Sequence, residues 1–192
     1  MVSRRWALSL VFVAAASCAV SSRVNLASRT SNPQTKTFQA HGISFDYPGN
    51  WVAFDARSPG PDQAATQKSE DVVGLDDLNV VSITALVVPP SQQGSSAWSD
   101  EVISGFTQAF AESGIQVKGG PDKILVGGEK GIRWKIRQPS GVGYVLDTTL
   151  VVLFRGDTEY YVRCQHTALR ASEMDRGCDQ VLGTLHLGRA KS

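Results

Sequence analysis

The stretch that decides the fold runs from Gly42 to Trp51 and reads GISFDYPGNW. Its large apolar residues, Ile43, Phe45 and Tyr47, occupy every second position, with polar residues between them. Side chains of a strand point alternately to the two faces of a sheet, so this period of two predicts a half-buried strand. The Pro-Gly-Asn sequence that follows predicts a turn, after which the chain resumes an extended run.

Two segments have the spacing of amphipathic helices. In the first, apolar residues recur every three or four positions and form one stripe; they are Trp98, Val102, Phe106, Ala109 and Phe110. Ser96 is its expected N-cap and Gly114 its expected end. The second helix is expected from about Glu173 to Leu182, with Met174 and Cys178 on its apolar face.

Further β-rich runs surround the first helix. The sequence predicts strands over residues 79–88, 124–126, 132–138, 144–154 and 159–165. Residues 58–70 are rich in Pro, Gly, Gln and Asp and predict a long exposed loop. The order of strands, helix, strands and helix, with hairpin-length links, predicts an α+β fold in which a mainly antiparallel sheet packs with helices.

The N-terminal 17 residues have the organisation of a secretory signal. Arg4 and Arg5 precede a short apolar run over residues 7–16, which is about half the length needed to span a bilayer. The run ends in Ala-Ala-Ser before Cys18, and this resembles the bacterial lipobox, whose cysteine receives a diacylglycerol. Ordinary cleavage near the same place, with Cys18 unmodified, is the alternative. The two arginines also fit twin-arginine export, but ordinary Sec signals often carry two arginines, so the Sec route is preferred and twin-arginine export is the alternative.

A cysteine with two acyl chains would hold the protein stably on a membrane without spanning it. We therefore predict a signal peptide over residues 1–17, a lipidated cysteine and flexible tether over 18–35, and one folded domain over 36–192. This places the protein on the extracytoplasmic face of the cell membrane. The chain of 192 residues carries a net charge of only +1, so no overall field favours nucleic acid as a partner.

The remaining cysteines, Cys164 and Cys178, are expected to meet. Cys164 and His166 share one face of a predicted strand, and Cys178 lies on the inner face of the last predicted helix. If Cys18 carries lipid, the other two cysteines form a pair in an oxidising compartment, which favours a disulfide. Two free thiols or a zinc site are the alternatives, and a zinc site would lack a fourth ligand.

The sequence shows no pattern typical of an active site. The chain has three histidines, His41, His166 and His186, and none lies beside a Gly-x-Ser-x-Gly elbow. The acidic pairs Glu70-Asp71 and Asp76-Asp77 are interpreted as solvated charge in or beside the long loop. Residues 127–131 are glycine-rich, but no helix follows to bind a phosphate, so a turn is expected. We expect no enzymatic activity, no cofactor and no bound metal.

One predicted strand, 132–138, carries alternating charge. Its apolar residues point one way, and its three cations, Arg133, Lys135 and Arg137, point the other. At about 3.3 Å per residue the cations lie within about 13 Å of one another, and Arg163 is expected to extend the row. The functional hypothesis is a docking stripe for anionic lipid, acidic polymer or an acidic envelope protein. The alternative is an ordinary solvated strand face.

The segment 42–51 also resembles the opening of PsbP-like domains, in which an aromatic-rich strand is followed by Pro and then Trp. The mid-chain helix, the Gly-containing hairpin near 127–131 and a last helix running into residues 185–187 fit the same pattern. With the lipobox and the cysteine pair, the chain is similar to the actinobacterial, LpqN-type lipoproteins of that superfamily over about residues 36–189. The resemblance implies an antiparallel sheet sandwiched by helices and a non-catalytic binding or assembly role.

We therefore expect a non-catalytic cell-envelope lipoprotein that binds or assembles with an envelope partner. Two alternatives remain. A carrier of a small apolar ligand or lipid would require a sizeable apolar pocket. An envelope hydrolase is less favoured, because the sequence shows no catalytic triad or metal-binding set.

Overall fold

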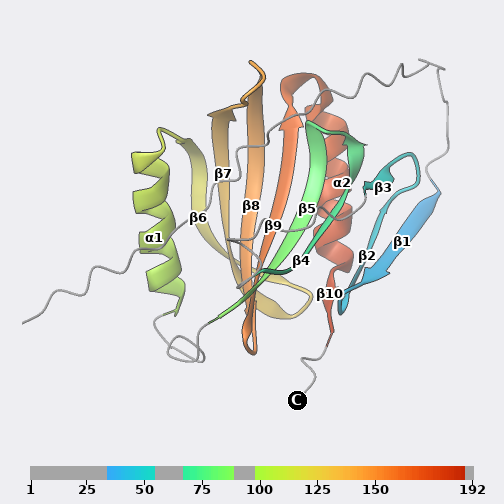
Figure 1. The fold of residues 1–192 in the computed structure, drawn as a ribbon, viewed down its shortest axis with the longest axis horizontal. Helices are drawn as coiled ribbons and strands as arrows, with labels where there is room; N and C mark the ends of the chain where they lie inside the picture. Colours follow the sequence, from blue (N-terminus) through green and yellow to red (C-terminus); the bar gives the residue numbers. More distant parts are fainter. Residues whose placement is uncertain (1–33, 55–66, 89–97, 189–192) are drawn as a thin grey trace, which may run out of the picture.

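The computed structural model describes residues 34–54, 67–88 and 98–188, and in these ranges it contains two antiparallel sheets and two α-helices (Figure 1). The predicted signal peptide, Cys18, the proposed N-cap Ser96 and most of the predicted tether lie outside the described residues. The tether was predicted to reach residue 35, but Thr35 already belongs to the first strand. Within the described ranges, no helix is long and apolar enough to cross a membrane.

The smaller sheet contains β1 (Thr35–Ala40), β2 (Ile43–Pro48) and β10 (His186–Leu187), in the order β1-β2-β10. His41 and Gly42 make the two-residue turn between β1 and β2 with φ values of 48° and 77°, as tight hairpin turns require. The three alternating apolar residues of β2 are buried and the residues between them are half-buried. This confirms the predicted half-buried strand.

The larger sheet has seven strands in the order β3-β4-β5-β9-β8-β7-β6, each antiparallel to its neighbours. Its strands are β3 (Val52–Phe54), β4 (Gln67–Asp76), β5 (Asn79–Val87), β6 (Gln116–Val126), β7 (Glu129–Pro139), β8 (Val145–Arg155) and β9 (Thr158–Thr167). Together with the two helices, this sheet confirms the predicted α+β class. Gly127 and Gly128 form the turn between β6 and β7, as expected.

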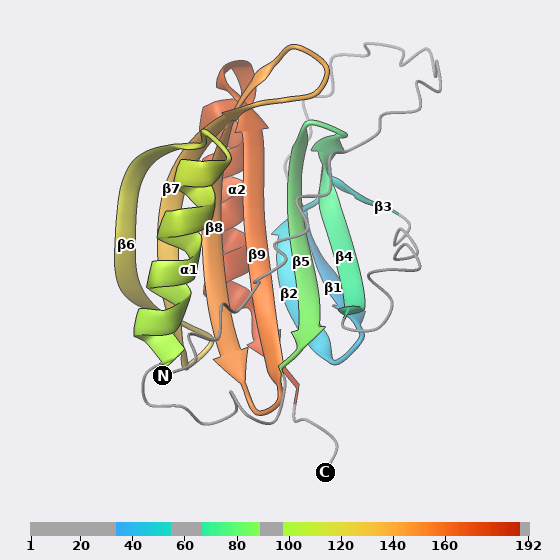
Figure 2. The same cartoon turned by 60° about the vertical axis from the view of Figure 1, so that its left-hand side comes forward.

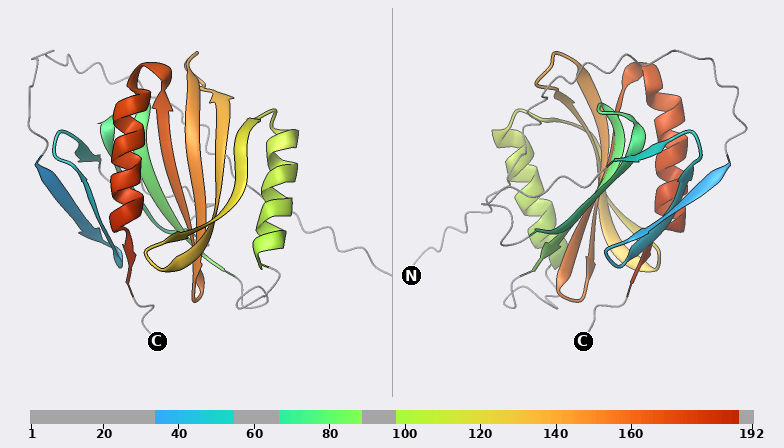
Figure 3. Two further views of the ribbon diagram at one scale, coloured as in Figure 1. Left: turned by 180° about the vertical axis from the view of Figure 1, so that it is seen from behind. Right: turned by 45° about the vertical axis from the view of Figure 1, so that its right-hand side comes forward.

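The helices cover opposite faces of the larger sheet (Figures 2 and 3). The first, α1 (Trp98–Glu112), lies over the β6–β8 end, where Phe106 and Phe110 pack in one cluster with Trp134. The second, α2 (Ala171–Thr184), follows a short 3₁₀ helix, η1 (Ala168–Arg170). It is two residues longer at each end than expected and packs between the larger sheet and β2.

The main core lies between the larger sheet, α2 and the smaller sheet. Trp51, Val151 and Met174 are completely buried there. A disulfide between Cys164 and Cys178, with an S–S distance of 2.03 Å, joins β9 to α2. Beside it, His166 Nε2 lies 3.4 Å from a carboxylate oxygen of Asp175. In the described part of the chain, no group of three His, Cys, Asp or Glu side chains is arranged to hold a metal ion.

One prediction about β4 is wrong. The exposed loop was expected to continue to Glu70, but β4 begins at Gln67 and pairs along its length with β5. Asp71, which was interpreted as a solvated charge, points into the protein from this strand and is only 3% exposed. The reason is the pairing itself, because the pleat turns every second residue of β4 toward the main core whatever its polarity.

A polar cavity as the candidate binding site

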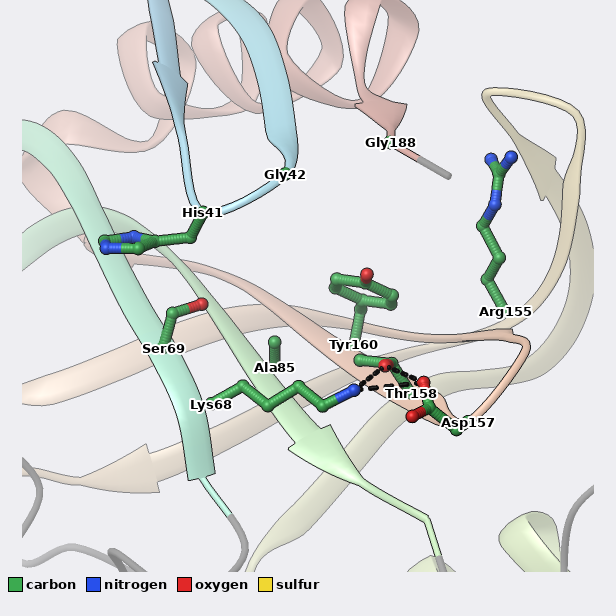
Figure 4. A pocket seen from close by; sticks show the side chains of 10 residues that line it. All are labelled: His41, Gly42, Lys68, Ser69, Ala85, Arg155, Asp157, Thr158, Tyr160 and Gly188. Atoms are coloured by element: carbon green, nitrogen blue, oxygen red, sulfur yellow. Dashed lines mark hydrogen bonds and ion pairs between the residues drawn. The ribbon is translucent and has the colours of Figure 1, made fainter. Parts of the chain in front are cut away.

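A cavity of about 510 Å³ opens at one end of the larger sheet, where the β1–β2 turn, the β8–β9 turn and the end of β10 meet (Figure 4). Its floor is formed by Ser69, Ala85 and Tyr160, which are register partners on β4, β5 and β9 and therefore share one sheet face. Ala85 is the only wholly apolar side chain among the described residues that line the cavity.

Tyr160 brings a hydroxyl group into the middle of the cavity. Figure 4 shows its ring standing on the floor, with the hydroxyl directed toward the side where Gly42 and Gly188 lie. Burial is the main cause that raises the pKa of Tyr160 above its ordinary value. The hydroxyl therefore stays protonated at neutral pH and can donate a hydrogen bond to a ligand.

Lys68 is held along one side of the cavity by two partners. Its Nζ lies 3.0 Å from a carboxylate oxygen of Asp157 and donates a hydrogen bond to Thr158 Oγ1 at 2.6 Å. The hydrogen bond from the Thr158 side chain, followed by that from Lys68, lowers the pKa of Asp157. The carboxylate of Asp157 is therefore ionised at neutral pH. The ammonium group is fixed at the mouth instead of ranging through solvent.

Arg155 supplies a second cation on the opposite side, as Figure 4 shows. Its Nη1 donates a hydrogen bond to the backbone carbonyl of Leu187 at 2.7 Å and lies 3.0 Å from a carboxylate oxygen of Glu129. These contacts connect the end of β8 to β10 and to the start of β7. The guanidinium plane carries further N–H groups that remain available for a bidentate contact.

His41 and Asp71 form a pair at the third side. His41 Nδ1 is 2.8 Å from Asp71 Oδ1, with the histidine side chain 51% exposed and the aspartate 3% exposed. The contact uses Nδ1 of the ring, and Nε2 makes no hydrogen bond with any described residue. The second oxygen, Asp71 Oδ2, is buried and has no hydrogen-bond partner among the described residues.

The pair at His41 resembles part of a catalytic triad, so a nearby nucleophile is relevant. Ser69 also lines the cavity, but no hydrogen bond joins its hydroxyl to His41 within the described residues. Nucleophilic catalysis needs such a nucleophile–base contact.

The predicted cation row occupies a different place, on the strand β7. Arg133, Lys135 and Arg137 share one face, as the alternation predicted. Two of them are neutralised by neighbouring strands: Arg133 lies 3.0 Å from an oxygen of Asp122, and Arg137 binds both oxygens of Asp147 at 2.7 Å. Lys135 is exposed and makes no ion pair with any described residue.

Arg163 does not extend this row, contrary to expectation. Val151 pairs with Arg133 on one side and with Val162 on the other, so Val162 shares the face of the row. Arg163, the next residue, therefore points to the opposite face of the sheet, the face that α1 covers further along. The sequence correctly predicted that Arg163 and Val162 point to opposite faces of β9. It could not predict which of these faces also carries the cations of β7, because that depends on the register of both strands with β8.

Sequence reasoning missed the cavity. It considered His41 only as a histidine without a catalytic neighbour. The other polar residues come from the β4 strand that was partly predicted as loop and from the β8–β9 turn. The inner face of β4 carries the polar residues Ser69 and Asp71 before Val73, so it lacks the apolar period of two that marks a buried strand face. No local signal indicates that this face meets the β1–β2 turn.

Comparison with known proteins gives matches to structures only. No known protein family and no curated protein matches the sequence. Among solved structures, the chain is similar to a protein of Bacteroides thetaiotaomicron VPI-5482, with a TM-score of 0.52 and 15% identity over 82% of this chain. The match spans 50% of the length of that protein.

Two smaller proteins match over nearly their whole length. Cyanobacterial PsbP from Synechocystis sp. PCC 6803 has a TM-score of 0.56 and 12% identity, over 85% of this chain and 98% of that one. LpqN, which is involved in cell envelope biogenesis of Mycobacterium tuberculosis, has a TM-score of 0.54 and 10% identity, over 83% and 93%. Similarity at such low identity concerns the fold alone. This similarity and the strand topology show that the chain has the PsbP-like fold, which the segment 42–51 predicted.

Proposed function

We propose that this protein is a non-catalytic binding module of the cell envelope, anchored by lipid on Cys18, and that the polar cavity binds a negatively charged group of an envelope partner. The observation that carries the proposal is the composition of the cavity. Lys68, paired with the lining residue Asp157, and Arg155, paired with Glu129, stand on opposite sides of the Tyr160 hydroxyl, with His41 at a third side. Charged donors and a neutral hydroxyl around one space suit a phosphate or a carboxylate.

The same cavity argues against a carrier of apolar ligands. Pockets for apolar molecules are lined mainly by hydrophobic side chains, whereas seven of the ten described residues that line this cavity have charged, hydroxyl or imidazole side chains. The apolar interior is elsewhere and is filled, with Phe45, Ile83 and Val151 at most 2% exposed. We therefore prefer recognition of a polar group on a partner to transport of a lipid chain.

The envelope location is supported by two independent considerations. The lipobox-like segment that ends in Cys18 predicts lipidation after export, and LpqN, which shares the fold, is involved in cell envelope biogenesis. A lipid-anchored module stays close to envelope partners, so modest affinity in the cavity suffices for a high occupancy. The role in binding or assembly follows from this combination.

The experiment is a titration followed by NMR, with inorganic phosphate, glycerol 3-phosphate and acetate as probes of the soluble Cys18→Ser protein. We expect saturable shifts at backbone amides of the cavity, centred on Lys68 and Tyr160. Lys68→Gln should weaken binding by about tenfold, because it removes one fixed cation and leaves Asp157 uncompensated. Tyr160→Phe should weaken it less, since one neutral hydrogen bond is lost.

The matched control is Lys135→Gln, which removes an exposed cation from the β7 row and leaves the cavity intact. It should bind the probes as the unmodified protein does. Binding that is lost in Lys135→Gln and kept in Lys68→Gln would assign recognition to the row instead. Absence of saturable shifts at the cavity with every probe would contradict the proposed binding site.

A further inference from the structure

Four large apolar side chains are exposed at the end of the molecule opposite the cavity. Three belong to the β7–β8 hairpin: Val142 is 48% exposed, Tyr144 55% and Val145 57%. The fourth, Leu169 in η1, is 92% exposed. The pairing of Leu146 with Thr167 places the start of β8 beside the end of β9 and thus brings the hairpin close to η1. We call these four residues the apolar tip.

The apolar tip lacks charge in its own sequence. Residues 138–146 read QPSGVGYVL and residues 167–169 read TAL, so neither segment contains an acid or a base. A single exposed aliphatic residue needs no explanation. A group of them on adjacent uncharged turns indicates an interaction surface. The other end of β8 differs, because there Arg155 belongs to the charged cavity.

The hairpin presents these side chains in a fixed conformation. Ser140 and Tyr144 are joined twice: the amide of Ser140 donates to the carbonyl of Tyr144 at 2.6 Å, and the amide of Tyr144 donates to Ser140 Oγ at 2.8 Å. Gly143 adopts a φ of 87°, which glycine tolerates without strain. The hairpin backbone that carries Val142 and Tyr144 is therefore preorganised, so little conformational entropy of this backbone is lost on binding.

The apolar tip and the cavity lie at the two ends of β8, which runs from Val145 to Arg155 (Figure 2). The chain enters the domain at Thr35 and reaches the cavity only at His41, so it enters away from the cavity. The 16 residues between Cys18 and Thr35 span up to about 55 Å when extended, at about 3.4 Å per residue. An anchor on Cys18 thus permits the apolar tip to touch the membrane while the cavity faces away.

We propose that the apolar tip inserts into the interfacial layer of the bilayer that holds the lipid of Cys18, and so orients the cavity outward. The orientation rests on the proposed lipid anchor. Tyr144 suits the boundary between headgroups and acyl chains, since its ring is apolar and its hydroxyl polar. Arg170, directly after Leu169, is exposed and lies 3.3 Å from a carboxylate oxygen of Glu173, and it adds a cation beside the apolar tip for anionic headgroups.

The test uses the lipidated protein in vesicles of phosphatidylcholine and phosphatidylglycerol, with an environment-sensitive fluorophore on Val142→Cys. The matched control carries the same label on Leu125→Cys. Leu125 is also apolar and is 73% exposed, but it lies at the other end of the larger sheet. We expect the Val142 label to shift to the blue and to be quenched by spin-labelled lipid at least fivefold more than the Leu125 label.

A second variant keeps the inference falsifiable. Tyr144→Asp in the Val142-labelled protein should abolish the quenching, and Leu125→Asp should leave it unchanged. Co-flotation with vesicles reports the anchor separately. If the protein floats with the vesicles while the fluorophores at both positions remain in water, the proposed insertion of the apolar tip is overturned and the anchor is not. Blue-shifted Val142 fluorescence that persists without vesicles and falls on dilution would assign the apolar tip to a second copy of the chain, and would also overturn the inference.

Discussion

At the residue scale, the surroundings of each carboxylate decide what it contributes. Asp147 on β8 accepts two hydrogen bonds from Arg137, and this contact is the largest cause that lowers its pKa. Glu159 on β9 accepts hydrogen bonds from Tyr161 and Trp98, yet burial dominates and raises its pKa. The two acids lie on different faces and at different ends of the same sheet. The effect of each on the pH dependence of the free energy of unfolding can therefore be measured with its own substitution.

The first prediction concerns the pH dependence of the Asp147 pair. The folded pKa of Asp147 lies below its ordinary value of 3.8, so the pair adds to the free energy of unfolding above that value. This contribution is lost as the pH falls through the folded pKa. Arg137→Gln should therefore lower the urea midpoint at pH 7 and have a diminishing effect below about pH 4, measured from pH 7 to pH 2.5. A midpoint difference that stays constant over this range would contradict the assignment.

Burial of Asp71 shows why residue identity alone misled the sequence analysis. An acid next to another acid is usually solvated, and Glu70 and Asp71 were interpreted so. In the structure the two residues face opposite sides of β4, and the inward one is balanced by His41 from a turn 30 residues earlier. A contact between residues this far apart in the chain does not affect the local composition. The pair of His41 and Asp71 could therefore not be predicted from the sequence pattern.

At the scale of elements, the contact between α2 and the segment after β2 leaves no room for a larger side chain at one position of the helix. A methyl group added at Gly177 would clash with the ring of Trp51 and approach Cγ of Pro48 at 3.2 Å. Trp51 is completely buried, and its indole is the side chain on which the middle of α2 rests. The burial of Trp51 beside Pro48 thus requires a glycine at position 177 of α2.

The second prediction compares two glycines of α2. Gly177→Ala should lower the free energy of unfolding by about 1–3 kcal/mol, because overpacking displaces Trp51. Gly183→Ala on the same helix meets nothing within 4 Å and should raise it by about 0.5–1 kcal/mol, the usual gain from alanine in a helix. Chemical denaturation of the three proteins measures both. Equal effects of the two substitutions would refute the proposed packing of α2 on Trp51.

The strands show where pattern reasoning succeeds and where it fails. β2, β7, β8 and β9 were predicted because apolar residues mark one or both faces. The first half of β6 was missed, since Gly119, Gly120 and Pro121 interrupt it and its register to β7 shifts there. β4 was missed because it begins with polar residues and directs Asp71 inward. Irregular pairing and buried charge remove the periodicity on which prediction depends.

At the scale of the whole molecule, the two ends of the larger sheet differ in chemistry. One end holds the cavity with Lys68 and Arg155, and the other holds the uncharged apolar tip around Tyr144. Fold class and topology type followed from the sequence, because they depend on periodicity and element order. The cavity did not, because its residues come from five separate segments that only the assembled sheet brings together.

The proposed function depends most on the lipid anchor at Cys18. The most direct measurement is the mass of the N-terminal peptide of the protein extracted from cell membranes. We predict a peptide that begins at Cys18 and carries a diacylglycerol on its sulfur, with Cys18→Ser protein absent from the membrane fraction or left unprocessed. An N-terminus at another residue, or an unmodified Cys18 thiol in membrane-bound protein, would contradict the claim.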